Sequence, residues 1–230
     1  MIPDWFRPIA ELILRHALPE TLKLAGLAVT ASLVIGLLLG ILMTMNVRPV
    51  RGLIRFYIEV WRGLPILVTV LFIYWMAAAD VRAVRFELDA LTAGVVALSL
   101  WGSAQVAEAT RGAVQSIARE QHEAAAALGF GWVGRHAYVI VPQALRRLLP
   151  PVVSLLVNII QNTTIVYLIG VSEVLETANR QFENVTFGLT GAERAPDYAV
   201  FVIYGFVLLL FFMISFPLTL LARYLERRLV

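Results

Sequence analysis

The chain has 230 residues, of which 60% are hydrophobic and 15% are charged, with a mean hydropathy of +0.79. Soluble domains run nearer to half apolar and a quarter charged, so this composition indicates a membrane protein. The absence of cysteine excludes a disulfide framework and a thiolate metal site, and the formal charge of +3 comes from 19 basic against 16 acidic residues.

Five stretches are long and apolar enough to cross a bilayer, whose hydrocarbon core of about 30 Å needs about 20 mostly apolar residues per helix. We expect the transmembrane helices at about residues 22–45, 54–79, 91–115, 148–171 and 198–221. The first stretch is too long, and begins too far along the chain, for a cleaved signal peptide. The sequence therefore predicts an all-α membrane protein with five transmembrane helices in a single transmembrane domain, residues 1–230.

Arginines between the apolar stretches predict how the chain is oriented, because cytoplasmic connections carry an excess of basic residues. The connections after the first and third stretches and the C-terminal tail are rich in arginine, whereas those after the second and fourth are acidic or mixed. We therefore expect a periplasmic N-terminus, a cytoplasmic C-terminus and a cytoplasmic segment at about 119–142. This distribution is typical of a membrane protein and not of a nucleic-acid-binding one.

The cytoplasmic segment contains a short helix-favouring sequence followed by a glycine. Residues Glu120–Leu128 favour a helix, and Gly129 is a good helix stop. The small side chains of residues 124–127 would let a partner surface approach the backbone closely. From composition alone, a solvated connecting helix fits equally well.

The spacing within this segment adds a resemblance to a known family. It reads Glu123-Ala124-Ala125, three residues, Gly129, nine residues, and then V-I-V-P ending at Pro142. This resembles the EAA signature of importer-type ABC permeases, which reads EAA, three residues, G, nine residues and I-x-L-P. The resemblance implies a cytoplasmic coupling helix, between the third and fourth spans, that docks into a groove of a separate ATPase subunit.

Further stretches are similar to the polar amino acid subfamily of these permeases, the histidine/glutamine/glutamate permease family with the type I importer fold. They are WRGLPILV at residues 61–68, AEATRGAVQSIAREQHEAA at residues 107–125 and IIQNTTIVYLIGVSEV at residues 159–174. The resemblance covers about residues 21–228. It implies a multi-pass subunit of the bacterial inner membrane that moves a polar amino acid by alternating access.

The resemblance also implies partners. ATP and magnesium would be bound by a dimer of the separate ABC ATPase, and a periplasmic or extracellular solute-binding protein would deliver the substrate. A second permease subunit, identical or paralogous, is expected because one five-span bundle is too small to enclose an alternating-access cavity. We expect this chain to lie in membrane lipid and to bind no nucleic acid.

Catalytic and cofactor motifs are absent from the sequence. There is no GxxxxGK[ST] loop, so the chain should not bind ATP through a P-loop of its own. His16, His122 and His136 are scattered without the spacing of a metal site. No serine has an obvious base beside it. We therefore expect no enzyme activity, no metal and no cofactor in this chain.

A polar stripe on the fourth span is the first candidate for the substrate path. At 100° per residue, Ser154, Asn158, Gln161 and Asn162 fall on one face of a helix. Polar groups at membrane depth normally face a cavity, a bundle interior or a subunit contact. The family resemblance places Gln161, Asn162 and Thr163 beside the central pathway. The alternative is that the stripe joins helices by hydrogen bonds.

Two further spans contribute candidates to the path. On the third span Gln105 and Glu108 share a face, and Glu108 could pair with an arginine or contact substrate. On the second span Arg62, Gly63 and Pro65 interrupt the helix. Such a break can free backbone groups for a ligand, or it can be a simple kink near the membrane interface.

Three classes of function remain open from the sequence. The first is an importer permease, with a sequence around Gln161 that is closer to glutamate and aspartate importers, or importers of their amides, than to basic amino acid ones. The second is a channel or secondary transporter for a small solute, which would need no ATPase. The third is a membrane anchor or assembly protein, in which the polar stripe would only support helix packing.

Overall fold

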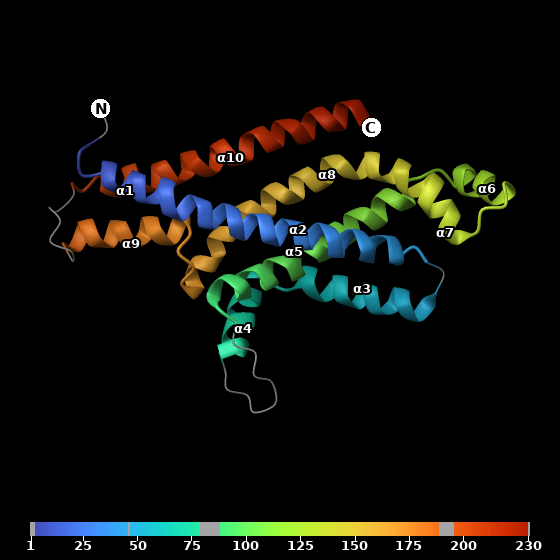
Figure 1. Ribbon diagram of the computed structural model, residues 1–230, viewed down its shortest axis with the longest axis horizontal. Coiled ribbons are helices and arrows are strands. Elements are labelled where there is room, and N and C mark those ends of the chain that lie inside the picture. The colour runs from blue at the N-terminus through green and yellow to red at the C-terminus, as the bar shows by residue number, and fades with distance from the viewer. Residues whose placement is uncertain (1–2, 46, 79–87, 189–195, 230) are drawn as a thin grey trace. The chain divides into compact units, whose positions relative to one another are not determined.

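The structure is a computed structural model that describes residues 3–45, 47–78, 88–188 and 196–229 (Figure 1). Within these ranges every regular element is helical. The long helices are α2 (Leu18–Leu42), α3 (Arg48–Gly63), α4 (Ile66–Ala78), α5 (Ala90–Gln115), α8 (Val141–Asn162), α9 (Val174–Phe187) and α10 (Ala199–Leu229). The short ones are α1 (Arg7–Leu12), π-helical η1 (Ile13–Ala17), α6 (Arg119–Ala127), α7 (Trp132–Arg135), π-helical η2 (His136–Ile140) and 3-10-helical η3 (Thr163–Ile169).

Four helical segments of the described chain are long and apolar enough to cross a membrane: Arg7–Leu42, Ala90–Gln115, Trp132–Ile169 and Ala199–Leu229. A fifth candidate is the pair α3 and α4, which meets the same test only when its two helices are taken together. The structure thus confirms an all-helical protein with up to five spans. The predicted periplasmic N-terminus and cytoplasmic C-terminus stay predictions.

The second span differs from the straight helix expected at 54–79. The axes of α3 and α4 are bent by 104°. At the break Leu64 has φ −85° and ψ 138°, an extended conformation. The cause is Pro65, whose ring disfavours helical angles at the residue before it. The predicted interruption at residues 62–65 is therefore present, and it turns the chain sharply instead of only kinking it.

Two other spans start earlier than the sequence predicted. Helical structure is continuous from Arg7, and not from residue 22, and it is continuous again from Trp132 into the fourth span. Pro150 and Pro151 lie inside α8 and do not open it. A proline removes the hydrogen bond to the carbonyl four residues back, so these two leave backbone acceptors of the preceding turn free.

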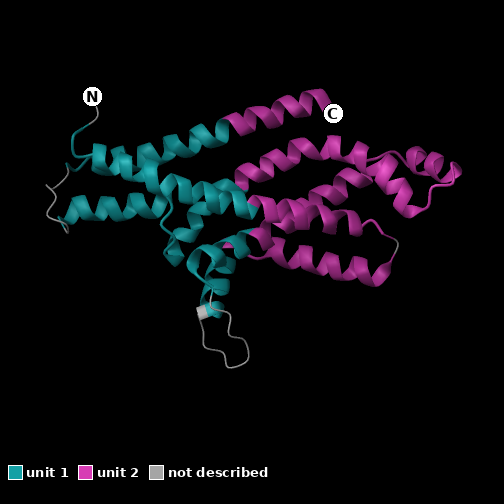
Figure 2. Cartoon of the chain, in the orientation of Figure 1, with its two compact units in different colours: residues 1–28, 67–98, 159–216 teal, residues 29–66, 99–158, 217–230 magenta. Residues whose placement is uncertain are grey.

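The chain divides into two compact units (Figure 2), which are described separately: residues 1–28, 67–98 and 159–216, and residues 29–66, 99–158 and 217–230. In the first unit, α1 and η1 pack against α9 and α10. The buried side chains of this core are Phe6, Ile9, Ile13, Ala17, Val174, Ala178, Val185, Ile203 and Val207. Its apolar contacts thus join the start of the chain to segments more than 150 residues away.

A buried polar joint connects the first long helix of this unit to α9. The Thr21 hydroxyl donates to the carbonyl of Ala17 at 3.0 Å and accepts the backbone N–H of Val174 at 3.0 Å. Next to it, the fully buried Glu173 caps α9 and accepts the N–H groups of Leu175 and Glu176. Burial raises the pKa of Glu173 to about 7, because removal from water disfavours the carboxylate.

In the second unit, α2 and α5 approach each other closely through two glycines. A Cβ at Gly36 would lie 2.5 Å from the Cβ of Val106, and one at Gly40 would lie 2.4 Å from the Cβ of Thr110. Small residues four apart on a membrane helix allow this kind of backbone contact. The structure therefore requires glycine at both positions.

Helix α3 packs on α5 in the same unit. Ile54 and Ile58 bury their side chains with Ala107, and the Tyr57 hydroxyl lies 2.7 Å from the hydroxyl of Ser103. Helices α2, α3 and α5 thus form one packed group, which positions the polar face of α3 described below.

We predict that Gly36→Ala lowers the unfolding temperature of the detergent-solubilised protein. The added methyl would meet Val106 and also the backbone oxygen of Ser103, at 2.7 Å, and overpacking of this kind costs about 1–3 kcal/mol. The matched control is Gly205→Ala in α10, where nothing lies within 4 Å of the new Cβ. Equal unfolding temperatures for the two variants would contradict the close approach of α2 and α5.

We also predict that protein stability falls as the pH rises from about 4.5 to about 7. The folded-state pKa of Glu173 is raised, so its contribution is complete below the unfolded-state pKa and is lost through the folded-state one. The loss is on the order of 3 kcal/mol. Thermal unfolding of the native chain and of Glu173→Gln across this pH range measures it. The fall in stability with rising pH should be smaller in Glu173→Gln than in the native chain. It should be unchanged in the control Glu183→Gln, which alters an exposed acid of α9.

Candidate functional site

The glycine of the EAA-like sequence ends α6 in a defined cap. Gly129 has φ +86°, a left-handed conformation that favours glycine. Its N–H donates to the carbonyl of Ala126, and the N–H of Phe130 donates to the carbonyl of Ala125. These two bonds form a Schellman motif. The motif explains in physical terms why a glycine stands four residues after Ala125.

The residues of this motif differ in their exposure. Glu123 and Ala124 are exposed, and the Glu123 carboxylate accepts from Arg119 one turn earlier at 2.8 Å. Ala125 is buried and anchors the helix, whereas Gly129 is exposed. Pro142 is exposed and lies within the continuous helical segment that starts at Trp132, so it gives no backbone N–H to the preceding turn. The α6 segment thus presents Glu123, Ala124 and Gly129 on its surface.

Side-chain contacts attach this segment to the ends of α5 and α8. Arg147 of α8 donates to the carbonyl of Ser116, at 2.5 Å, and to its hydroxyl. Gln143 donates to Gln121 of α6 at 3.3 Å. A buried apolar cluster lies below them: Ala113, Val114, Ile117, Ile140, Ala144 and Leu148. The segment is therefore held from both of its flanking spans.

Histidine adds a third attachment. The Nδ1 of His136 in η2 donates to the carbonyl of Trp132 at 2.9 Å, and its Nε2 lies 3.2 Å from the hydroxyl of Thr44. Thr44 follows directly after α2. Residues 119–142 therefore contact the end of α2 as well as α5 and α8, a contact that the scattered histidines of the sequence did not predict.

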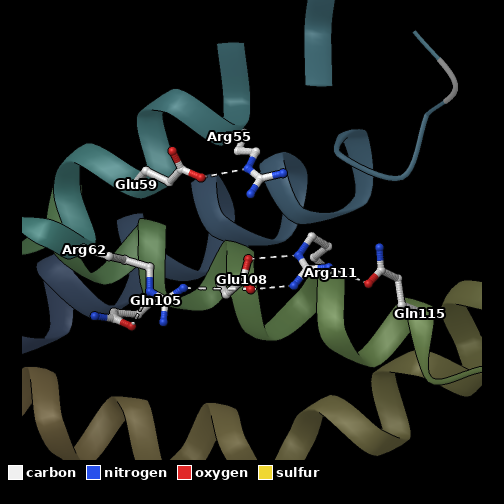
Figure 3. Close-up of polar contacts among 7 residues, drawn as sticks. All are labelled: Arg55, Glu59, Arg62, Gln105, Glu108, Arg111 and Gln115. Atoms are coloured by element: carbon white, nitrogen blue, oxygen red, sulfur yellow. Dashed lines mark hydrogen bonds and ion pairs between the residues drawn. The ribbon is translucent and has the colours of Figure 1, made fainter. Parts of the chain in front are cut away.

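The polar candidates of the second and third spans meet in one cluster (Figure 3). Glu108 of α5 pairs with Arg111 at 2.5 Å and lies 3.8 Å from Arg62 of α3. Arg62 also donates to the side-chain oxygen of Gln105 at 3.2 Å. Pairing of Glu108 with both arginines, one of the two interpretations of the sequence, is thus present in the structure. The cluster places charges of both signs next to one another.

A cavity of about 1010 Å³ opens beside this cluster, within the second unit. It is lined by Arg62 and Glu108 and extends along α3 to residues 119–136, where His122 and His136 form part of the wall. Gly63 and Pro65 lie at the exposed break that follows α3. The cavity thus connects the charged cluster to the segment that carries the EAA-like sequence.

The polar residues of the fourth span are placed differently. Ser154, Asn158 and Gln161 are exposed, and the Ser154 hydroxyl donates to the carbonyl of Pro150. Asn162 is half-buried, and Thr163 is fully buried and donates to the carbonyl of Ile160. None of these five residues is among those that line the described cavity. The structure therefore brings together the candidates of the second and third spans, separately from those of the fourth.

One feature of the cavity was missed at the level of sequence. Arg48, Arg51, Arg55, Glu59 and Arg62 all line it from α3. They recur every three or four residues, so a helical projection of α3 would have placed them on one face. The prediction of an apolar span starting at residue 54 hid this periodicity.

We predict that the Glu108–Arg111 pair contributes more to stability than the Arg55–Glu59 pair. The side chains of the first pair are 29% and 28% exposed, whereas those of the second are 70% and 64% exposed. Exposed pairs contribute about 0–1 kcal/mol because water screens them. Double-mutant cycles with glutamine at each position, read by thermal unfolding, measure both pairs. A coupling energy for Glu108–Arg111 no larger than for Arg55–Glu59 would contradict the placement of the cluster.

The chain is similar to permease proteins of bacterial amino acid transport systems. The chain is 36% identical over 230 residues to the glutamine transport system permease protein GlnP of Escherichia coli strain K12, covering 98% of this chain and 97% of the relative. It is 29% identical over 211 residues to the probable glutamine ABC transporter permease protein GlnM of Bacillus subtilis strain 168, covering 91% and 90%.

Among solved structures, one of an amino acid ABC transporter with histidines matches all of both chains, at 30% identity and a TM-score of 0.79. The family model for the inner membrane component of binding-protein-dependent transport systems matches residues 32–230. The multi-pass helical fold, the EAA-like segment and these matches agree, and the chain belongs to the family of inner membrane components of binding-protein-dependent transport systems.

Proposed function

We propose that this chain is the transmembrane subunit of an ABC importer that moves a polar amino acid across the bacterial inner membrane. The observation that carries the proposal is the α6 segment. It exposes Glu123 and Ala124, ends at the left-handed glycine Gly129, and is attached to the ends of three spans. A partner that moves this segment moves those spans with it.

The work is divided among several chains in this proposal. A dimer of a separate ATPase binds ATP and magnesium and engages residues 119–142 from the cytoplasm. An external solute-binding protein delivers the amino acid on the other side, and a second permease subunit completes the pathway. Family membership supports the binding protein, because the family is defined by dependence on one. The arginine-rich connections support a cytoplasmic position for the coupling segment.

The charged cluster supports an amino acid as the substrate. A zwitterion needs partners for a carboxylate and an ammonium group, and Arg62, Gln105 and Glu108 supply donors and an acceptor within one cluster. Buried or half-buried charges in a span mark substrate pathways more often than they serve stability alone. The exposed polar residues of α8, Ser154, Asn158 and Gln161, supply a second polar surface for the path.

Glutamine is the first substrate that we would test. Two of the relatives given above, at 36% and 29% identity, are named for glutamine transport. An uncharged amide side chain also suits a stripe of asparagine and glutamine, which can donate to it and accept from it. Glutamate and aspartate come next, since the sequence around Gln161 favours acidic amino acids and their amides.

The test is the ATPase activity of the complete transporter in lipid, with its binding protein, across a panel of amino acids. We expect stimulation by one or a few polar amino acids, and its loss in Glu123→Arg, which reverses a charge at the docking surface. Gly129→Ala should also reduce stimulation, because a left-handed residue with a Cβ is strained by about 1–2 kcal/mol and shifts the end of α6.

The matched control is Glu226→Arg, the same charge reversal at an exposed position of the C-terminal helix. It should leave the stimulation unchanged. Basal and stimulated activities that are indifferent to Glu123→Arg would contradict coupling through this segment. Solute flux sustained by a gradient, without any ATPase, would replace the importer by a channel or secondary transporter.

A further inference from the structure

Helix α3 has three faces of different character. Ile54 and Ile58 are buried against α5, and the polar stripe from Arg48 to Arg62 lines the cavity. The third face is apolar and exposed, with Leu53 at 71% and Phe56 at 66% exposure. At 100° per residue the cavity face lies between the buried face and the exposed apolar face. The exposed apolar face of such a helix is suited to contact the acyl chains of lipids.

The cavity carries a large excess of positive charge. Seven arginines line it against two glutamates, so the excess is five charges with both histidines neutral. Part of this charge is compensated locally, because Arg55 pairs with Glu59, and Arg62 and Arg111 share Glu108. The excess is far larger than the single carboxylate of an amino acid requires.

Three of these arginines have no acidic partner among the residues that the structure describes: Arg48, Arg51 and Arg135. Arg48 and Arg51 lie one turn apart at the start of α3 and are exposed. The Nε of Arg135 is buried in the wall, and no protein acceptor in the described part of the chain reaches it. Arg135 itself lines the cavity, so an anion in the cavity would compensate the charge of its guanidinium group.

The chemistry that matches these groups is a phosphate ester. Arginine presents a planar fork of donors that fits phosphate oxygens, and several arginines together suit a phosphate better than one carboxylate. The exposed apolar face of α3 favours a phosphate that carries acyl chains. Basic pockets at the cytoplasmic ends of membrane helices bind the headgroups of acidic lipids.

We propose that this cavity binds the headgroup of an acidic phospholipid. Arg48 and Arg51 hold the phosphate, Arg135 donates from the wall, and the acyl chains lie along Leu53 and Phe56. The proposal rests on the proposed orientation, which places α3 at the cytoplasmic leaflet where acidic lipids face basic residues. The bound lipid would form part of the wall of this cavity.

The experiment measures lipid retained by the full chain, purified in non-ionic detergent and mixed with equal amounts of phosphatidylglycerol and phosphatidylcholine. Native mass spectrometry counts the bound lipids. We expect the wild-type chain to retain phosphatidylglycerol preferentially, and the double variant Arg48→Gln/Arg51→Gln to lose that preference by roughly tenfold to thirtyfold. The matched control, Arg223→Gln/Arg227→Gln, removes two exposed arginines from α10 and should keep the preference.

Two further arms keep the result decisive if the double variant is poorly folded. Raising the salt concentration should weaken retention of phosphatidylglycerol by the wild-type chain, because exposed charges are screened. Millimolar inorganic phosphate should leave the lipid in place.

Equal retention of both lipids by the wild-type chain, or equal loss of preference in the two double variants, would overturn the proposal. Displacement by inorganic phosphate would overturn the lipid as the occupant. Because no ATPase takes part, failure here leaves the importer proposal untouched, and failure of the ATPase test leaves this measurement unaffected.

Discussion

The structure depends first on the requirement that backbone polar groups find partners inside the chain wherever water is absent. This requirement makes the described elements helical, and it makes the ends of helices the places where the protein can differ from a plain bundle. The ends that matter here are few. Leu64 and Pro65 turn α3 away from α4, and the Schellman cap at Gly129 closes α6. At both places the local sequence satisfies or removes the backbone groups that an abrupt helix end exposes.

The same requirement for partners affects the placement of charged side chains. Helix α5 carries a single acidic residue, Glu108, and two arginines lie beside it. Seven arginines of the second unit line a single cavity that extends along α3. In the first unit, the buried acid Glu173 is held by two backbone N–H groups at the start of α9. The carboxyl groups of Glu108 and Glu173 are therefore each held by two groups that donate to them or pair with them.

Much of the fold was predictable from the sequence, because hydropathy and helix length follow directly from bilayer thickness. The end of α6 at Gly129 was predictable as well, since a left-handed cap favours glycine directly after the C-cap residue of a helix. Pairing of Glu108 with arginine followed from the cost of an unpaired charge. The sharp turn at Pro65 was predictable as a break but not as an angle, because a proline disfavours helical angles at the preceding residue without fixing the direction of the next helix.

Other features could not be derived from the sequence, since they depend on contacts between distant residues. Thr21 meeting Val174, and Thr44 meeting His136, join positions that no local pattern relates. The polar stripe of the fourth span was predicted as one surface, yet its members have different environments, from exposed Gln161 to half-buried Asn162. A change from α-helix to 3-10 helix at residue 163 alters the angle per residue and ends the regular projection.

Helix α5 has a mechanical consequence. It runs without a break for 26 residues, a length of about 39 Å at 1.5 Å per residue. Only Ser116–Ala118 separate it from α6, and Arg147 clamps Ser116. Because α5 is a continuous helix and its short connection to α6 is held by Arg147, a displacement of α6 is transmitted to α5. A force on the surface of α6 would therefore displace Glu108, seven residues before the end of α5, by moving the whole helix, without any rearrangement of the backbone between them.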